Sequence, residues 1–398
     1  MTPYDMREDL TPRRVTNAMW DYSWLKCHYP GGPYEDWDKV TDELLERGFN
    51  TVRIDAYPLV IGALESLDQP LVFGEDPLKN WGPSVGEHEH KVPGGLVEFM
   101  TILRKKGIYA ILSSWGHTIS QLCKTEGSKL DDFTDRDLFK AAWVRTLDLL
   151  KENDLLSHVL YVDLDQEFPY FSPFNKALQQ AGVVDSTAGT SMEDAMEAAG
   201  QRQGSLTQSA WIPPQLAYVQ KLFMDMIPFF QNRYPGTRFT YSLTTFWKEI
   251  RSLGLRLFDT LELHIWIHSP RYDNRLAPII KDRGDHDYRD HQGRIDKAMS
   301  IMKPMFVREM HNKLTAAKSW SEEIAAPVIT TESWGPWWHM DHPHLRWDWL
   351  SDWCAQCMKL AADYGFWGVT PWNYAHPYWK NWSNVAWYRR VNDAFLKS

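Results

Sequence analysis

Short runs of apolar and β-branched residues alternate with longer amphipathic runs along almost the whole chain. The alternation forms eight strand–helix units, which is the number that a (β/α)8 TIM barrel requires. We therefore predict an α/β protein in which residues 1–398 form a single barrel domain. A doubly wound parallel sheet is the alternative, but no glycine-rich phosphate turn follows the first strand. The predicted strands are residues 15–20, 51–55, 108–113, 158–164, 238–243, 260–265, 327–331 and 365–370.

Each predicted strand is followed by a predicted helix, and two of the connections are longer than βα loops usually are. They comprise about residues 168–212 and 268–291, and both come after a predicted strand. Barrel active sites form at the C-terminal ends of the strands, so we predict that these rim insertions wall a pocket. The alternative is that they are surface decoration. The predicted helices are residues 36–47, 95–106, 135–151, 215–232, 246–255, 293–319, 347–363 and 385–396.

Two predicted strands end with a glutamate that has aromatic residues near it. Glu167 follows the fourth strand and directly precedes Phe168, and Glu332 follows the seventh strand, two residues before Trp334. In a barrel the two side chains would face each other across the same opening. A carboxyl pair in that position is what a retaining glycosidase uses. Either glutamate alone would suit a solvated or salt-bridged loop equally well.

The chain carries 21 tryptophans, more than a core filled with aliphatic side chains would explain. Indole faces bind the C–H faces of sugars, and polar neighbours bind the hydroxyl groups. We therefore interpret the surplus mainly as sugar platforms, with part of it in the core. The formal charge of −9, without a basic stripe, argues against a nucleic-acid partner. The tryptophan–polar pairs at strand ends are Trp20 with Asp21, Trp115 with His117, and Trp372 with Asn373.

Four motifs, by their order and their places at strand ends, resemble glycoside hydrolase family 5 and its clan of cellulase-like retaining barrels. They are VRIDAYP on the second strand, the glutamate after the fourth, TTESWG on the seventh and TPWNY on the eighth. The resemblance covers residues 20 to about 387. It implies that Glu167 is the acid/base and Glu332 the nucleophile. It also implies that Arg53 orients the nucleophile and that Trp372 floors the subsite of the sugar to be released.

The sequence departs from the family's pattern beside these glutamates. Gln166 stands where the family usually has an asparagine that binds the sugar 2-hydroxyl, so the stereochemistry recognised at C2 stays open. His264 is followed by Trp266, where the family usually has a tyrosine that contacts the nucleophile. We assign His264 and Trp266 to the pocket. Asp165 is a rival acid, because it shares a strand face with Glu167 if the strand stays regular.

The runs AMWDYSWLKCHYPGGP and TPWNYAHPYWKNWSN are most similar to an intracellular bacterial branch of family 5. That branch is associated with exo-β-mannosidase activity on Man-β-1,4-GlcNAc. We therefore predict a retaining exo-β-glycosidase, with β-mannosidase as the best interpretation, that acts on a small oligosaccharide. A β-glucosidase, a β-galactosidase or an endo-acting β-glycanase of the same fold is the alternative within this class. A non-catalytic carbohydrate-binding barrel and a metal-dependent hydrolase are the alternatives outside it.

We predict no cofactor and no metal ion. The histidine-rich patches at residues 87–90, 285–287 and 339–344 lack the spacing of zinc motifs. Cys354 and Cys357 form a CxxC without a second pair, inside a predicted helix, which favours buried or idle thiols. No apolar run suits a signal peptide or a membrane span, which predicts a cytoplasmic protein without a membrane partner. A homo-oligomer is compatible with the sequence, which does not determine it.

Overall fold

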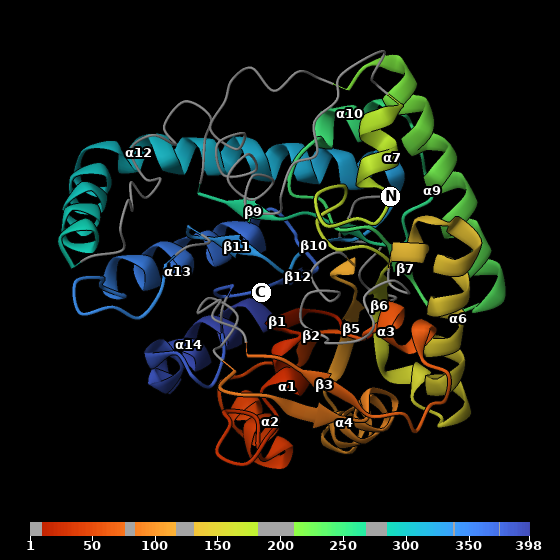
Figure 1. The fold of residues 1–398 in the computed structure, drawn as a ribbon. Coiled ribbons are helices and arrows are strands. Elements are labelled where there is room, and N and C mark those ends of the chain that lie inside the picture. The colour runs from red at the N-terminus through yellow and green to blue at the C-terminus, as the bar shows by residue number, and fades with distance from the viewer. Residues whose placement is uncertain are drawn as a thin grey trace.

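The central element is a ring of eight parallel strands (Figure 1). A computed structural model describes residues 10–75, 84–116, 131–181, 211–267, 285–336, 339–373 and 375–398. The strands pair in the order β7-β6-β5-β2-β1-β12-β10-β8, and a parallel bridge between Leu243 and Leu263 nearly closes the ring. This arrangement confirms the predicted (β/α)8 barrel. The strands are β1 (Val15–Asp21), β2 (Thr51–Asp55), β5 (Tyr109–Ser113), β6 (Val159–Asp163), β7 (Phe239–Thr240), β8 (Leu261–Glu262), β10 (Val328–Thr330) and β12 (Gly368–Val369).

Helices surround the strands, and their ends follow local sequence signals (Figure 1). The Asp135 carboxylate accepts hydrogen bonds from the first turn of α6, and Gly107 ends α4 in the left-handed region with φ of 69°. None of the helices in the described ranges is long and apolar enough to cross a membrane. The α-helices in the described residues are α1 (Ser23–Lys26), α2 (Trp37–Glu46), α3 (Pro58–Ala63), α4 (Val92–Lys106), α6 (Arg136–Glu152), α7 (Asn175–Gln180), α9 (Pro213–Arg233), α10 (Trp247–Ser252), α12 (Asp285–Ile324), α13 (Asp348–Asp363) and α14 (Val385–Leu396).

The fifth to eighth strand units differ in detail from the prediction. β7 and β12 are shorter than predicted, and the sixth unit divides into β8 and β9 (Ile265–Trp266). β9 pairs in parallel with β11 (Ser333–Trp334), which continues the direction of the seventh unit beyond the barrel ladder. The division falls at Leu263 and His264, whose backbone N–H groups still donate to the carbonyl groups of Ile329 and Leu243. The antiparallel pair of β3 (Leu71–Phe73) and β4 (His88–His90) is an addition that the sequence did not indicate.

The two predicted rim insertions are only partly described. Of the first, the described residues include α7, and residues 182–210 lie outside the described part of the chain. Of the second, residues 268–284 lie outside it, whereas residues 285–291 form the first turns of α12. The long helix therefore begins inside the stretch that we predicted as a rim loop.

Most tryptophans in the described residues are buried, so a large share of the surplus that we interpreted as sugar platforms packs in the core. A buried tryptophan contributes a large apolar surface, and its N–H satisfies a carbonyl group that has left the strand ladder. Trp20, a predicted sugar-binding residue, is fully buried: its indole nitrogen donates to the Ala375 carbonyl at 2.9 Å, and its ring packs edge-on against Tyr34. The same kind of hydrogen bond joins Trp24 to Asp55, Trp143 to Leu164, and Trp334 to Thr370.

Candidate active site

The glutamates that the sequence placed at two strand ends meet in the barrel. Glu167 follows β6, Glu332 follows β10, and His264 lies between β8 and β9. One carboxylate oxygen from each glutamate and one ring nitrogen of His264 lie within 4.8 Å of one another. All three side chains are buried, and Glu167, at 11% exposed, is more open than Glu332 at 3%. The predicted pairing of the two carboxyl groups is therefore present in the structure.

Glu332 is held by two donors on the same carboxylate oxygen. Nη2 of Arg53 donates to Oε1 at 2.5 Å, and Nε2 of Gln166 donates to it at 2.6 Å. Arg53, on β2, is fully buried and is itself fixed by Asp21 through two hydrogen bonds of 2.8 and 3.0 Å. Its Nη1 donates to the Thr331 hydroxyl at 2.6 Å. The planar guanidinium suits the bidentate pair with Asp21, which fixes its orientation. Arg53 therefore holds Oε1 of Glu332 in place and leaves Oε2 to other contacts.

Glu167 is positioned by its backbone as well as by its side chain. Its φ of 50° places it in the left-handed region, which is rare for a residue other than glycine and is often kept at functional sites. Its N–H donates to the Ser242 hydroxyl at 2.8 Å, and Nδ1 of His264 lies 2.7 Å from its Oε1. The Ser242 hydroxyl in turn donates to Oε1 of Gln166 at 3.3 Å. This contact orients the Gln166 amide so that its nitrogen faces Glu332.

Burial and mutual repulsion shape the protonation of the site. Burial raises the pKa of Glu332 to about 7, against the attraction of His264 and Arg53 and with the repulsion of Glu167 added. Burial also disfavours the charged form of His264, but Glu332 and the other neighbouring carboxylates outweigh it and raise its pKa to about 10. Glu332 therefore keeps a proton up to near neutral pH. His264 is then an imidazolium directed at Glu167.

The other predicted pocket residues lie around this centre with different surroundings. Trp372 is buried, and its ring contacts His339 and Trp347 edge-on at 6.4 and 5.8 Å. Asn373 accepts a hydrogen bond from the Ser333 backbone at 3.2 Å, next to Glu332 in sequence. Through His339, the predicted patch at residues 339–344 therefore joins the surroundings of Trp372.

Trp115, Trp266 and His117 complete the predicted set. Trp115 is buried with its ring 4.6 Å from that of Phe171, and Trp266 lies buried on β9. His117 lies outside the described residues. The rival acid Asp165 is fully buried, and its electrostatic neighbours are Asp163 and Tyr241 and not the glutamate pair.

Three polar residues of the site were missed by the sequence analysis. Glu262, Thr331 and Ser242 are fully buried and contact Arg53, His264 or Gln166. A signal was present, because Glu262 and His264 are two positions apart in the predicted strand 260–265 and would share one of its faces. Polar residues inside apolar strand runs of a barrel point to its interior, and this pattern would have found them.

The three side chains of the centre are also of residue types that bind metal ions. Within the described residues, Glu167, His264 and Glu332 form the one group of three or more potential ligands that lie together. Arg53 already neutralises Glu332, and Nδ1 of His264 is directed at Glu167. These contacts favour a carboxyl pair with organic counter-charges over a metal site.

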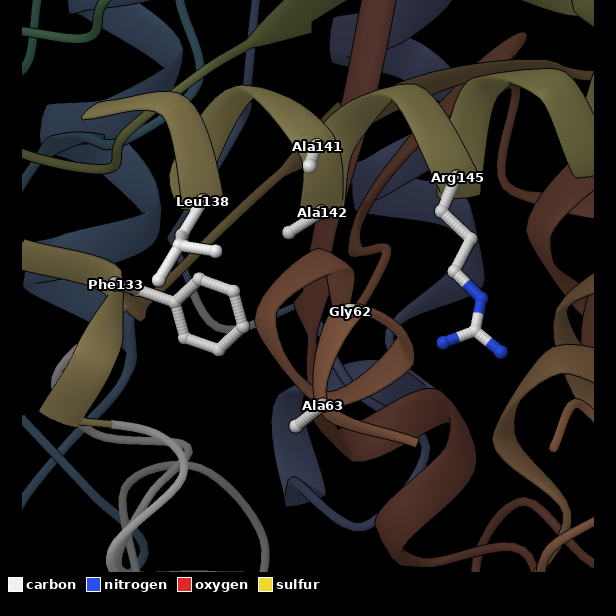
Figure 2. Close-up of a pocket in the computed structure, with 7 residues that line it drawn as sticks. All are labelled: Gly62, Ala63, Phe133, Leu138, Ala141, Ala142 and Arg145. Atoms are coloured by element: carbon white, nitrogen blue, oxygen red, sulfur yellow. The ribbon is translucent and has the colours of Figure 1, made fainter. Parts of the chain in front are cut away.

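A pocket on the outer side of the barrel wall has no part in this centre (Figure 2). Its volume is about 430 Å³, and it lies between α3 and α6. Arg145 is its one charged lining residue, and the guanidinium is directed at the carbonyl groups of Ile61 and Leu64. It holds no carboxyl group, so it offers no acid–base chemistry.

Known proteins resemble the chain over nearly its full length. A candidate glycoside hydrolase from Parabacteroides distasonis is 26% identical, with a TM-score of 0.77 and coverage of 96% of this chain and 93% of that one. A variant of the glycoside hydrolase family 5 mannosidase from Rhizomucor miehei is 11% identical, with a TM-score of 0.50 and coverage of 96% and 94%, which shows a shared fold. No curated protein matches the sequence. Residues 17–396 match the cellulase-like family, which is described as sugar-binding cellulase-like, and the chain belongs to this family.

Proposed function

We propose that the protein is a retaining β-glycosidase in which Glu332 is the nucleophile and Glu167 the acid/base. The observation that carries this proposal is that one carboxyl oxygen of Glu167 and one of Glu332 lie within 4.8 Å of each other. Retaining glycosidases hold their carboxyls about 5–5.5 Å apart, whereas inverting ones leave room for water at about 6.5–9.5 Å. Membership of a sugar-binding cellulase-like family supports a carbohydrate substrate.

The surroundings of the two carboxyls support different roles. Arg53 and Gln166 bind Oε1 of Glu332, so Oε2 is the oxygen that would attack the anomeric carbon. Glu167, the more exposed of the pair, would give its proton to the leaving glycosidic oxygen as that C–O bond breaks. The product is a glycosyl ester on Glu332. Glu167 would then remove a proton from water, which attacks the anomeric carbon and releases the sugar with its configuration retained.

The proposed substrate is a small β-linked oligosaccharide cleaved from its end, with a β-mannoside of the Man-β-1,4-GlcNAc type favoured. This choice rests on the resemblance to the exo-β-mannosidase branch. Gln166 is compatible with a β-mannoside. Its side chain is longer than the asparagine usual in the family and donates to Glu332 at 2.6 Å, which changes how the amide can hydrogen-bond the sugar 2-hydroxyl. The sugar in this subsite is thus the part of the proposal that most needs a direct test.

The decisive experiment is a panel of aryl β-glycosides with manno, gluco, galacto and N-acetylglucosamino groups, with the product anomer followed by NMR. We expect hydrolysis with retention, fastest on the mannoside. An inverted first product would exclude the mechanism, and a faster gluco or galacto substrate would exclude the mannosidase assignment. Sugar binding without turnover of any glycoside would favour the non-catalytic barrel.

Substitutions test the two roles separately. Glu332→Gln and Glu167→Gln should each fold and lose at least about 10³-fold of turnover on an unactivated glycoside. On an activated aryl glycoside, Glu167→Ala should keep more of the first chemical step than Glu332→Ala, because the leaving group then needs no proton. Asp165→Asn removes a buried carboxyl outside the pair and serves as the matched control. Turnover near the wild-type level in either glutamine variant would reject the assignment.

A further inference from the structure

A third glutamate, Glu262, is buried inside the barrel, and the proposed reaction assigns it no contact with the substrate. It stands on β8, and its side chain is 0% exposed. The Thr331 hydroxyl donates a hydrogen bond to its Oε1. The same oxygen lies 3.6 Å from Nη1 of Arg53 and 3.7 Å from Nε2 of His264. Glu262 therefore touches, from within the barrel, both cationic groups that contact the glutamate pair.

A buried carboxylate is costly unless nearby charges and hydrogen bonds compensate it. Here the compensation comes from side chains of the site itself. His264 has carboxylates on two sides: Nδ1 lies 2.7 Å from Glu167 and 3.7 Å from Glu332, and Nε2 lies 3.7 Å from Glu262. Nε2 also has Nη1 of Arg53 at 3.4 Å and the Gln166 amide nitrogen at 3.5 Å beside it, so Glu262 is the negative charge on a side of the ring that otherwise faces a cation and an amide. The charge of Arg53 is likewise shared among Glu332, Asp21 and Glu262. The positive charges of His264 and Arg53 are thus balanced by Glu262 as well as by the glutamate pair.

We propose that Glu262 is a positioning residue, a buried counter-charge that keeps His264 an imidazolium directed at Glu167 and helps to hold Arg53 on Glu332. This role rests on the proposed function, because it assigns Glu167 the proton transfer. When Glu167 gives up its proton, Oε1 of its carboxylate is left 2.7 Å from Nδ1 of the imidazolium, whose N–H stabilises the new charge. Glu262, on the other side of the ring, stabilises the imidazolium in turn.

The charged surroundings of Glu262 are consistent with this role. The attraction of Glu332, Glu167 and Glu262 overcomes burial and raises the pKa of His264 to about 10. Burial works against the ionised form of Glu262 as well, but the hydrogen bond of His264 and the charge of Arg53 outweigh it and lower its pKa. From β6, Tyr161 and Asp163 also face Glu262, and burial together with Glu262 raises the pKa of each. They stay neutral near pH 7 and leave the negative charge on Glu262.

Titration of the His264 ring by NMR, with histidine labelled at Cε1 and the signal assigned from a His264→Asn spectrum, tests the proposal without using activity. In the wild type, His264 should stay doubly protonated to at least pH 8. In Glu262→Gln, which keeps the shape and removes the charge, its titration should move down by at least about one pH unit. Glu262→Asp should keep most of the effect, and Asp165→Asn should leave the titration unchanged.

Three results would overturn the role of Glu262. These are a neutral His264 at pH 7 in the wild type, an unchanged titration in Glu262→Gln, or an equal shift in Asp165→Asn. If Glu262→Gln does not fold, the wild-type titration still decides. In kinetics, Glu262→Gln should lose at least tenfold in kcat, whereas Asp165→Asn should stay within twofold of the wild type. A wild type with the expected His264 titration and no turnover of any glycoside would refute the proposed function and leave the electrostatic role of Glu262 standing.

Discussion

Arg53 is the cation on which the buried acidic groups of the barrel depend, and Arg53→Met removes its charge while keeping a linear side chain. The guanidinium makes two hydrogen bonds to Asp21 and one to Glu332 with no solvent access. Breaking a buried ion pair by removing one partner costs about 3–5 kcal/mol, because the remaining charge has no partner. We expect a loss of this size in the free energy of unfolding at pH 8.

The pH dependence of that loss is the sharper part of the prediction. Without Arg53, the pKa values of Asp21 and Glu332 rise further above those of the unfolded chain. The folded state then binds more protons than the unfolded state, so stability rises as the pH falls. The loss should therefore be smaller at pH 5.5 than at pH 8, and Glu332 should be protonated and inactive as a nucleophile at pH 7.

Urea unfolding followed by tryptophan fluorescence at pH 5.5 and pH 8 measures this difference. Arg53→Lys is the matched control, since it keeps the charge but loses the planar fork. It should show a smaller loss with little dependence on pH. An equal loss for Arg53→Met at both pH values, or a loss below about 1 kcal/mol, would refute the reasoning, because an unpaired buried carboxylate must respond to protonation.

Three further predictions concern the same residues and the core. Ser242→Ala frees the Gln166 amide that orients Glu332, and should lower kcat by about 10²-fold with little change in KM, as measured in steady-state kinetics. In the wild type, Glu332 and His264 bind protons more tightly when folded, because their pKa values are raised from 4.5 to about 7 and from 6.5 to about 10. Their contribution to stability should therefore fall as the pH rises from about 4.5 to 10. The Tm of the wild type should fall more over this pH range than the Tm of Glu332→Gln, and an equal or smaller fall would contradict the prediction. Trp20→Phe should cost about 1–3 kcal/mol in urea unfolding and leave KM unchanged, because the indole serves a buried carbonyl; a raised KM would restore its role as a sugar platform.

Local sequence determined the barrel's units and the places of its two glutamates. Strand β2 and helix α14 begin and end where the periodicity placed them, because apolar spacing is set by neighbouring residues. Glu167 and Glu332 were found because the C-terminal ends of parallel barrel strands open on one face, whatever the detailed packing. The family resemblance acted in the same way, through short motifs at strand ends.

Only the tertiary structure decided which distant groups share the centre and which tryptophans belong to the core. The contacts of Arg53 with Glu262 and Glu332 join separate strands, and their distances depend on how the ring of strands closes. Trp20 and Trp372 look alike in sequence, each beside a polar residue at a strand end, and both are buried. Their neighbours differ, because Trp20 hydrogen-bonds the Ala375 carbonyl and Trp372 packs against His339. Burial depends on every segment that packs over a side chain, whereas a sequence pattern reports only on the segment that carries it.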